Sequence, residues 1–209
     1  MIDNYEYDQH GIIRQISCTP IEYDRTYVDV RYNTYGVLND YMSHLRLGYI
    51  TGSMGRLPHS VLDIGYGNGS FLSTCSTVVP ECRGYDISTY PVPENCTQVD
   101  DIYADHHDVV TFFDSLEHYQ DIDFLNKLQC NYVCISLPWC HYFSDEWFKN
   151  WKHRRPDEHL WHFNDKSLVK FMITQGFDCV NVCNVEDIIR KHSFSYQNIL
   201  TGIFKRISN

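Results

Sequence analysis

A run of glycines directly after a short apolar segment is the feature that most constrains how this chain can fold. Val61-Leu62-Asp63-Ile64 has the pattern of a buried strand, and glycines stand at positions 65, 67 and 69. Glycine has no Cβ, so the chain can turn sharply there and bring its backbone amides close to a ligand before a helix opens at Ser70. A strand, a glycine turn and a helix predict a nucleotide-sized pocket at the carboxyl end of the first strand of an open α/β sheet.

The rest of the chain repeats this alternation. Short apolar runs alternate with helical stretches at the spacing of βαβ units, which predicts a doubly wound, seven-stranded, mainly parallel sheet with helices on both faces. The expected strands are 61–64, 82–86, 97–99, 108–113, 132–137, 177–185 and 199–205, and the expected helices lie near 70–77, 122–129 and 166–175. The link between the last two strands is too short for a crossover helix, so we expect an antiparallel edge strand to close the sheet.

The first 58 residues do not follow this pattern. They are rich in tyrosine and contain one helix-like stretch, from Tyr35 to Leu47. We therefore expect two parts, an N-terminal cap or extension over residues 1–58 and a ligand-binding domain over residues 59–209. The tyrosines of the first part either pad the core or contact a substrate, and the sequence leaves both alternatives open.

Charge and composition exclude several classes of protein. A net charge of −10 at pH 7 disfavours a nucleic-acid partner, because binding to a phosphate backbone depends on Lys and Arg. The nine cysteines form no CxxC pair, which predicts reduced thiols in the cytoplasm. The chain has no apolar run of about 20 residues and no secretory signal, so we expect a soluble protein with no membrane partner. The oligomeric state is not indicated.

The position of the third glycine distinguishes between the classes of nucleotide ligand that such a loop can bind. Asp86 ends the second expected strand 21 positions after Gly65, the offset at which a carboxylate reaches ribose hydroxyls. The dinucleotide fingerprint requires glycine at position 70, which is Ser70 here. The spacing here is G-x-G-x-G. A ligand without a pyrophosphate does not require a glycine at the start of the helix.

At these residues the chain resembles the class I S-adenosylmethionine-dependent methyltransferases, which have a Rossmann-like fold. Their first motif, an acid-x-Gly-x-Gly-x-Gly run, is matched from Asp63 to Gly69, and the resemblance continues through residues 84–88, 108–118 and 176–177. A departure is Tyr66, where the family more often has a small residue. The resemblance implies that S-adenosyl-L-methionine is the cofactor.

The resemblance also assigns roles to cofactor-binding residues. Asp63 and the glycine amides would hold the methionine part, Asp86 the ribose hydroxyls, and Asp101-Ile102 would flank the adenine, with Asp114 on the pocket floor. The full set of implied cofactor-binding residues is Asp63, Gly65, Gly67, Gly69, Asp86, Ile87, Asp101, Ile102 and Asp114.

The acceptor side of such an enzyme carries a weaker signal. Methyl transfer from a sulfonium is an in-line displacement, so orientation and removal of a proton from the acceptor are sufficient. Catalytic candidates lie after expected strands: Glu117 and His118 after the fourth, and His141 after the fifth. His118 is the first candidate for a base, because histidine titrates near neutral pH. In the resembled family a Glu-His pair at this place often only supports the loop.

Residues 147–163 combine aromatic, cationic and histidine side chains between a strand and a helix. One interpretation is an acceptor clamp, with Trp139, Arg154, Arg155 and His159 as substrate-binding residues. The other is an aromatic plug in which His159 is hydrogen-bonded structurally. The histidines here show no closed four-ligand spacing with Cys140 or His141, so we expect no metal site.

Together these features predict a methyltransferase that acts on the oxygen or nitrogen of a small-molecule acceptor. Two alternatives remain. The first is a non-enzymatic, methyltransferase-like binding module, and the second is an RNA or protein methyltransferase that docks through the cluster from Lys149 to Arg155. The motifs of nucleobase methyltransferases are not found after the fourth expected strand, which favours a small acceptor.

Overall fold

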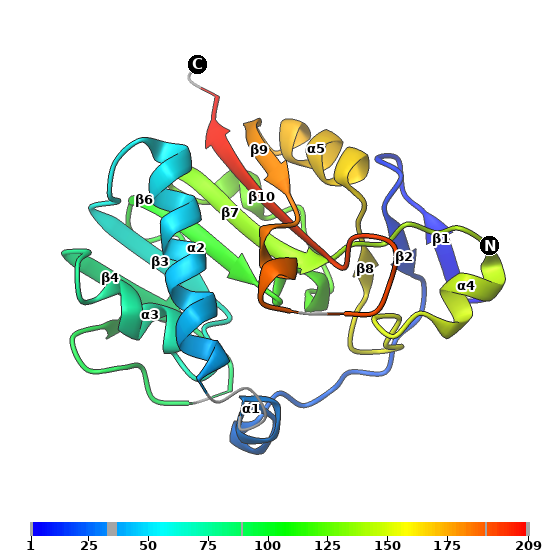
Figure 1. Ribbon diagram of the computed structural model, residues 1–209, viewed down its shortest axis with the longest axis horizontal. Helices are drawn as coiled ribbons and strands as arrows, with labels where there is room; N and C mark the ends of the chain where they lie inside the picture. Colours follow the sequence, from blue (N-terminus) through cyan, green and yellow to red (C-terminus); the bar gives the residue numbers. More distant parts are fainter. Residues whose placement is uncertain (1, 33–36, 89, 191, 208–209) are drawn as a thin grey trace.

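A seven-stranded sheet forms the centre of the molecule (Figure 1). The computed structural model describes residues 2–32, 37–88, 90–190 and 192–207. The sheet has the order β5-β4-β3-β6-β7-β10-β9. Its strands are β3 (Ser60–Ile64), β4 (Glu81–Tyr85), β5 (Thr97–Gln98), β6 (His107–Phe113), β7 (Cys130–Pro138), β9 (Phe177–Cys183) and β10 (Ile199–Arg206). All seven expected strands are therefore confirmed.

The strand directions agree with the expected mainly parallel sheet. β3, β4, β5, β6 and β7 pair in parallel. β10 runs antiparallel to β7 on one side and to β9 on the other. The antiparallel pair closes this edge of the sheet as predicted. β9 is the edge strand, and β10 lies between β9 and β7.

Helices cover both faces of the sheet, as expected. α2 (Leu38–Met54) and α3 (Ser70–Cys75) pack on one face, and α5 (Asp165–Thr174) packs on the other (Figure 1). Side chains along β6 alternate between the two cores: Val109 and Phe113 join α2 and α3, whereas Val110 and Phe112 join α5. All seven residues of β6 are buried, which is typical of a central strand in a parallel sheet.

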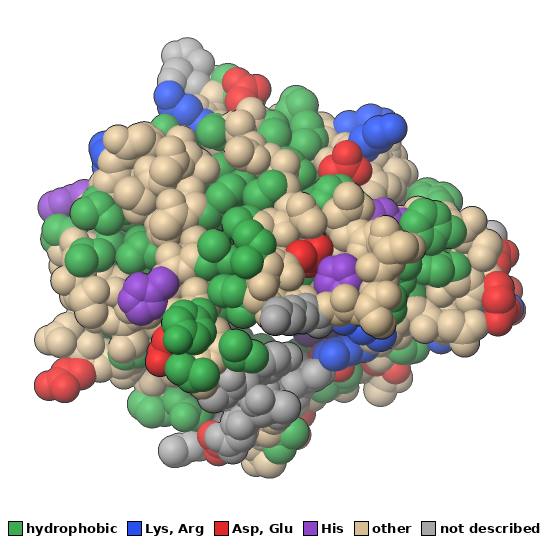
Figure 2. Space-filling view, in the orientation of Figure 1, with side chains coloured by type: hydrophobic (Ala, Val, Ile, Leu, Met, Phe, Trp, Pro, Cys, Tyr) green, Lys and Arg blue, Asp and Glu red, His purple; other side chains and the backbone are tan. Residues whose placement is uncertain are grey.

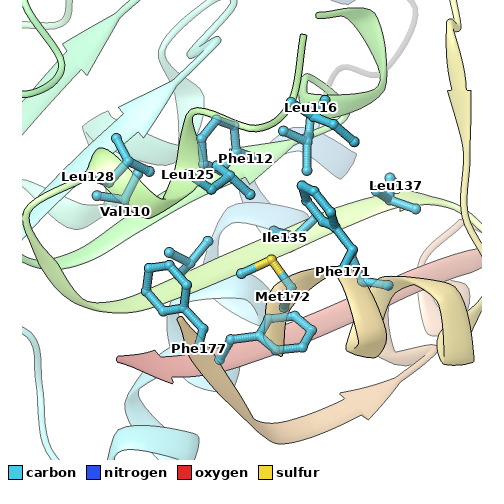
Figure 3. Packing of buried hydrophobic residues seen from close by; sticks show 14 of the residues in the cluster. Val110, Phe112, Leu116, Leu125, Leu128, Ile135, Leu137, Phe171, Met172 and Phe177 are labelled. Carbon is cyan, nitrogen blue, oxygen red and sulfur yellow. The ribbon is translucent and has the colours of Figure 1, made fainter. Parts of the chain in front are cut away.

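The core on the α5 side is rich in large side chains. Figure 3 shows Phe171 of α5 next to Leu116 and Ile135, with Met172 nearby, and all four belong to one buried cluster. The start of α5 is fixed by reciprocal hydrogen bonds, since Ser167 N donates to Asn164 Oδ1 at 2.8 Å and Asn164 N donates to Ser167 Oγ at 2.9 Å. This capping box explains why the helix begins where the sequence predicts it.

Two expected helices differ from the structure. The helix predicted near residues 122–129 is wrong, because only a 3-10 turn, η2 (Leu125–Lys127), lies there. Leu125 is buried by this turn without a helix around it. The stretch predicted from Tyr35 to Leu47 corresponds to α2, which continues to Met54 and is capped by Gly55 with φ 70°. Glycines at positions 48 and 52 hid this continuation, and residues 35 and 36 lie outside the described residues.

A second, three-stranded sheet joins the start of the chain to the region between β7 and α5. Its order is β1-β2-β8, formed by β1 (Tyr5–Tyr7), β2 (Ile13–Gln15) and β8 (Trp161–His162). A small core lies beneath it, in which Tyr5 and Ile13 pack with Phe148 of α4 (Asp145–Asn150). The sequence did not predict this sheet, because strands of two or three residues show no measurable periodicity.

The remaining elements are short. They are α1 (Arg25–Tyr32), η1 (Leu116–His118) and η3 (Val185–Ile188). The division at residue 58 stays a prediction; α2, which precedes it, packs on the sheet. Among the helices in the described ranges, none is long and apolar enough to cross a membrane.

Gly84 in β4 gives a test of the packing between the sheet and α3. A Cβ at Gly84 would lie 2.5 Å from Cδ1 of Tyr66 and 2.7 Å from Cδ1 of Leu72, so we expect Gly84→Ala to lower the free energy of unfolding by about 1–3 kcal/mol. Gly48→Ala is the control: it lies on the exposed side of α2 with open space around it, and it should raise stability by about 0.5–1 kcal/mol. Urea unfolding of both variants measures this, and equal effects would contradict the packing described.

Candidate functional site

The glycine loop after β3 is held in a backbone conformation that favours glycine. Gly65, Gly67 and Gly69 have φ angles of 80°, 56° and 75°, all in the left-handed region. A Cβ at Gly65 would lie 2.6 Å from Cβ of Ser115, whose hydroxyl donates to the carbonyl of Ile64 at 2.7 Å. The absence of a side chain at Gly65 therefore lets the loop after β6 rest directly on the glycine loop.

Asp86, just after β4, is fixed against the same loop. The amide of Gly67 donates to Oδ2 of Asp86 at 2.8 Å, and the amide of Ser88 donates to Oδ1 at 2.7 Å. A carboxylate offers about four lone-pair sites, so it can accept further hydrogen bonds from a diol. Next to it the side chain of Ile87 is 63% exposed and offers an apolar surface.

Tyr66, the unusual residue of the loop, is buried beside Gly84. Its hydroxyl donates a hydrogen bond to the carbonyl of Tyr90. Gly84 in β4 has no side chain, and this leaves space for the Tyr66 ring. The glycine turn therefore holds a tyrosine at a position where a small residue is more usual.

Asp63 lies within β3 and is 2% exposed. Its Oδ1 accepts a hydrogen bond from the hydroxyl of Thr111 at 2.7 Å. Burial raises the pKa of Asp63 to about 7, although the Thr111 hydroxyl and the charge of Arg46 oppose this rise. A cation bound next to this carboxyl group would favour its ionised form.

An open cavity of about 340 Å³ lies at the carboxyl ends of β4 and β5. Its walls combine aromatic and aliphatic side chains with carboxylates, which suits a flat heterocycle that carries an amino group. Its lining residues are Tyr85, Asp100, Asp101, Ile102, Tyr103, Tyr119 and Phe124. Two of them, Asp101 and Ile102, are the residues that the sequence predicts beside adenine.

Asp114 belongs to a network of four charged side chains. Arg190 Nη1 donates to its Oδ1 at 3.0 Å and Arg46 Nη2 to its Oδ2 at 3.2 Å, while Arg46 Nε donates to the buried Glu186 at 2.7 Å. Burial alone would raise the pKa of Asp114, but the two guanidinium groups hold it well below its usual range. The network ties the end of β6 to α2 and to η3. The sequence did not predict Arg46, Glu186 or Arg190, because they are distant in the chain and match no motif.

Three candidate residues from the acceptor side lie together. Glu117, His118 and His159 have potential ligand atoms all within 4.8 Å of one another. Glu117 is 1% exposed, and burial followed by the charge of Asp114 raises its pKa well above the usual value. The hydroxyl of Tyr23 lies 2.9 Å from Nδ1 of His118, so the N-terminal segment reaches this cluster.

The other candidates for the acceptor side lie in different surroundings. His141 stacks between the rings of Trp139 and Phe143, at centroid distances of 5.6 Å and 5.4 Å, and its Nε2 lies 2.8 Å from the carbonyl of Gln197. The structure therefore places His141 in a ring stack separate from Glu117 and His118. Its catalytic role remains an untested prediction.

The two predicted clamp arginines both have neighbours within the fold. Arg155 Nη1 donates to Oε1 of Glu158 at 2.9 Å, and the guanidinium of Arg154 lies 5.9 Å from the ring centroid of Tyr5. His159, by contrast, joins Glu117 and His118. Of the four residues predicted to bind the acceptor, the structure brings one to the cluster after β6.

Comparison with known proteins gives one family and many similar folds. The model of a family described as a methyltransferase domain matches residues 44–182. No protein of curated function matches the chain in sequence.

Three solved structures illustrate the similarity of fold. Magnesium protoporphyrin IX methyltransferase from Synechocystis, with bound SAH, has a TM-score of 0.63 at 18% identity, covering 88% of this chain and 96% of that one. An S-adenosylmethionine-dependent methyltransferase from Clostridium acetobutylicum has a TM-score of 0.61 at 9% identity, covering 88% and 98%. The Burkholderia thailandensis 1,6-didemethyltoxoflavin-N1-methyltransferase, with S-adenosylhomocysteine and 1,6-didemethyltoxoflavin bound, has a TM-score of 0.59 at 13% identity, covering 98% and 100%.

The charged network provides a stability prediction. Glu186→Ala would remove a buried carboxylate and leave two partly buried guanidinium groups with one carboxylate, and we expect it to lower the free energy of unfolding by about 3 kcal/mol, the low end of the range for breaking a buried ion pair. Glu6→Ala is the matched control, since Glu6 and Arg14 form an exposed pair whose loss should cost at most about 1 kcal/mol. Urea unfolding distinguishes the two, and a loss below about 1 kcal/mol for Glu186→Ala would show that the network is not a stabilising one.

Proposed function

The chain belongs to the methyltransferase domain family, and from this membership we propose that it transfers the methyl group of S-adenosylmethionine to an oxygen or nitrogen atom of a small-molecule acceptor. It is an S-adenosylmethionine-dependent enzyme of the Rossmann-like class. The observation that carries the proposal is the hydrogen bond from Gly67 to Asp86, which sets the glycine loop and the ribose-binding acid side by side.

The described residues offer a binding place for each part of the cofactor. We place its methionine part at the glycine loop, with its ammonium group near Asp63, and its ribose hydroxyls at Asp86. The cavity beyond β4 then receives the adenine beside Ile102 and Asp101. A bound sulfonium supplies an electrophilic methyl group and a good leaving group, so the protein has to orient an acceptor in line with it.

The acceptor would lie at the end of β6, where the loop from Asp114 to His118 rests on the glycine loop. The second sheet and its neighbouring segments cover this place, because Leu160 N donates to the carbonyl of Glu117 at 2.8 Å and Tyr23 reaches His118. His118 is the candidate to receive a proton from the acceptor. A covered site of this kind supports a small acceptor more than a polymer.

Two further observations support a small acceptor. By their names, two of the similar structures are methyltransferases of magnesium protoporphyrin IX and of 1,6-didemethyltoxoflavin. On the face shown in Figure 2, the described Lys and Arg side chains lie apart from one another and form no broad basic surface. Docking of RNA through Lys149–Arg155 is also less favoured, since Arg154 and Arg155 contact Tyr5 and Glu158.

The ribose-binding role of Asp86 can be tested by cofactor affinity. Asp86→Asn removes charge-assisted hydrogen bonds worth roughly 1.5–3 kcal/mol each, so calorimetry should show an S-adenosylmethionine Kd at least about tenfold higher. Asp105→Ala is the control, because this exposed carboxylate pairs with Arg83 on the surface and should leave the Kd unchanged. An unchanged Kd for Asp86→Asn would place the ribose elsewhere.

The raised pKa of Asp63 predicts a pH dependence of cofactor binding. Its ionised form attracts the cofactor's ammonium group, and with a pKa of about 7 this form is lost as the pH falls through 7. We expect S-adenosylmethionine to bind at least about tenfold more weakly at about pH 5.5 than at about pH 7.5. Asp63→Asn should remove most of this difference, and an equally steep profile in that variant would assign the titration to another group.

Transfer itself is tested with radiolabelled S-adenosylmethionine and fractionated small-molecule, RNA and protein extracts. Label in a small-molecule fraction supports the proposal, and label in RNA or protein identifies a macromolecular methyltransferase instead. A protein that binds the cofactor and labels no fraction would be a binding module. A reaction without the protein serves as the blank, and Asp86→Asn should transfer less label at cofactor concentrations below its raised Kd.

A further inference from the structure

The carboxyl group of Glu117 is buried without a hydrogen-bond partner on either oxygen among the described residues. Taking an acid out of water without compensation is costly, so such a group requires an explanation such as an ion that it binds. It stands in η1, one residue before His118. The methyl transfer proposed above assigns no role to the Glu117 carboxyl group.

Two imidazole rings lie next to this carboxyl group. The rings of His118 and His159 are 4.8 Å apart in an edge-to-face arrangement, and with Glu117 they form the group whose ligand atoms lie within 4.8 Å of one another. Nδ1 of His159 lies 2.9 Å from the carbonyl of His153. A carbonyl only accepts, so Nδ1 carries the proton and Nε2 carries the lone pair.

The surroundings of the two rings are those of metal-binding histidines. Such a histidine almost always has its other ring nitrogen hydrogen-bonded to a group that fixes the ring orientation. The His153 carbonyl does this for His159, and the Tyr23 hydroxyl lies 2.9 Å from Nδ1 of His118. Each ring is therefore contacted at Nδ1 by a residue outside the cluster.

We propose that Glu117, His118 and His159 bind a divalent transition-metal ion, such as zinc, that activates the acceptor. Two imidazoles and one carboxylate form a ligand set of transition metals, whereas magnesium and calcium take oxygen ligands. Ligand atoms around an ion at 2.0–2.2 Å lie about 3–3.5 Å apart, so rotation of the three side chains closes the site. Three protein ligands leave coordination positions for the acceptor.

The position of this site indicates what the ion would do. This inference rests on the proposed methyl transfer. The loop that carries Glu117 and His118 rests on Gly65 through Ser115, so the ion would lie at the cofactor's end of the sheet. A metal ion lowers the pKa of a coordinated hydroxyl, which favours an oxygen acceptor over a nitrogen acceptor. The acceptor's proton leaves to water, its oxygen forms a bond to the methyl carbon, and the carbon–sulfur bond breaks with its electron pair remaining on sulfur.

The sequence-based expectation of no metal rested on ligand spacing among residues 140–162, and it omitted Glu117. The fold brings His159 to Glu117 across more than 40 positions of the chain, through the backbone bond from Leu160 to the Glu117 carbonyl. In this proposal His118 is a ligand of the ion, and activation of the acceptor passes from its imidazole to the metal. Spacing along the chain does not reveal a site assembled in this way.

Cobalt(II) titration of the metal-stripped protein tests the site without any need for methyl transfer. We expect visible absorption bands that saturate at one equivalent and are displaced by zinc. Glu117→Gln and His159→Gln should each raise the cobalt Kd at least about tenfold. His106→Gln is the matched control, because His106 is exposed and precedes β6 at the opposite end of that strand. Absent bands, or an unchanged Kd in both site variants, would overturn the proposal.

A second measurement uses the unmodified sequence. Proton NMR of the cobalt-bound protein should show two strongly shifted, solvent-exchangeable signals, one from the remaining ring N–H of each histidine ligand. Intense near-ultraviolet charge transfer would instead identify cysteine thiolates as ligands and overturn the assignment. Calorimetric S-adenosylmethionine binding, measured in parallel, separates the two proposals: cofactor binding without cobalt binding refutes only the metal site, and the reverse refutes only the cofactor site.

Discussion

The close approach of Gly65 to Ser115 is the constraint on which the site depends. Because no Cβ stands at Gly65, the loop that leaves β6 rests directly on the loop that leaves β3. The hydroxyl of Ser115 completes the contact by donating to the carbonyl of Ile64. One loop carries the glycines that we propose to bind the cofactor, and the other leads to Glu117 and His118. A methyl donor and a group that activates the acceptor have to lie within a few ångströms of each other, and this contact provides that proximity.

Charge neutralisation holds the same loop from its other side. Asp114, with a φ of 54°, stands in a strained backbone conformation at the end of β6. Two arginines compensate for this position, Arg46 from α2 and Arg190 from the segment after η3, with Glu186 between them. Asp114, which the sequence predicts on the pocket floor, is therefore part of a structural network as well as a candidate neighbour of the cofactor. Helix, strand and C-terminal segment are tied together at the point where the two loops meet.

The features that the sequence predicted correctly are local ones. The strands of the large sheet other than β5 (Thr97–Gln98) contain their own apolar residues, and the loop from Asp63 to Gly69 contains its own glycines, so both are readable from neighbouring residues. The helix expected at 122–129 failed because apolar residues with helical spacing, including Leu125, are buried by a turn. The three-stranded sheet, the arginine network and the meeting of Glu117 with His159 join residues that are far apart in the chain. No periodicity or motif encodes such contacts, and only the tertiary structure reveals them.

The pairing of β2 with β8 also determines when each part of the protein forms during synthesis. Gln15 hydrogen-bonds with Asp157, a partner 142 positions later, so the first strands emerge from the ribosome long before their partners exist. Contacts between residues so distant in the chain carry a high loop-closure entropy and form late. The glycine loop and Asp86 follow strands β3 and β4, and these strands and β6 lie closer together in the chain. They can therefore pair before the C-terminal part of the chain is synthesised. The nascent chain would thus complete its nucleotide pocket first, and its earliest residues would be among the last to reach their places.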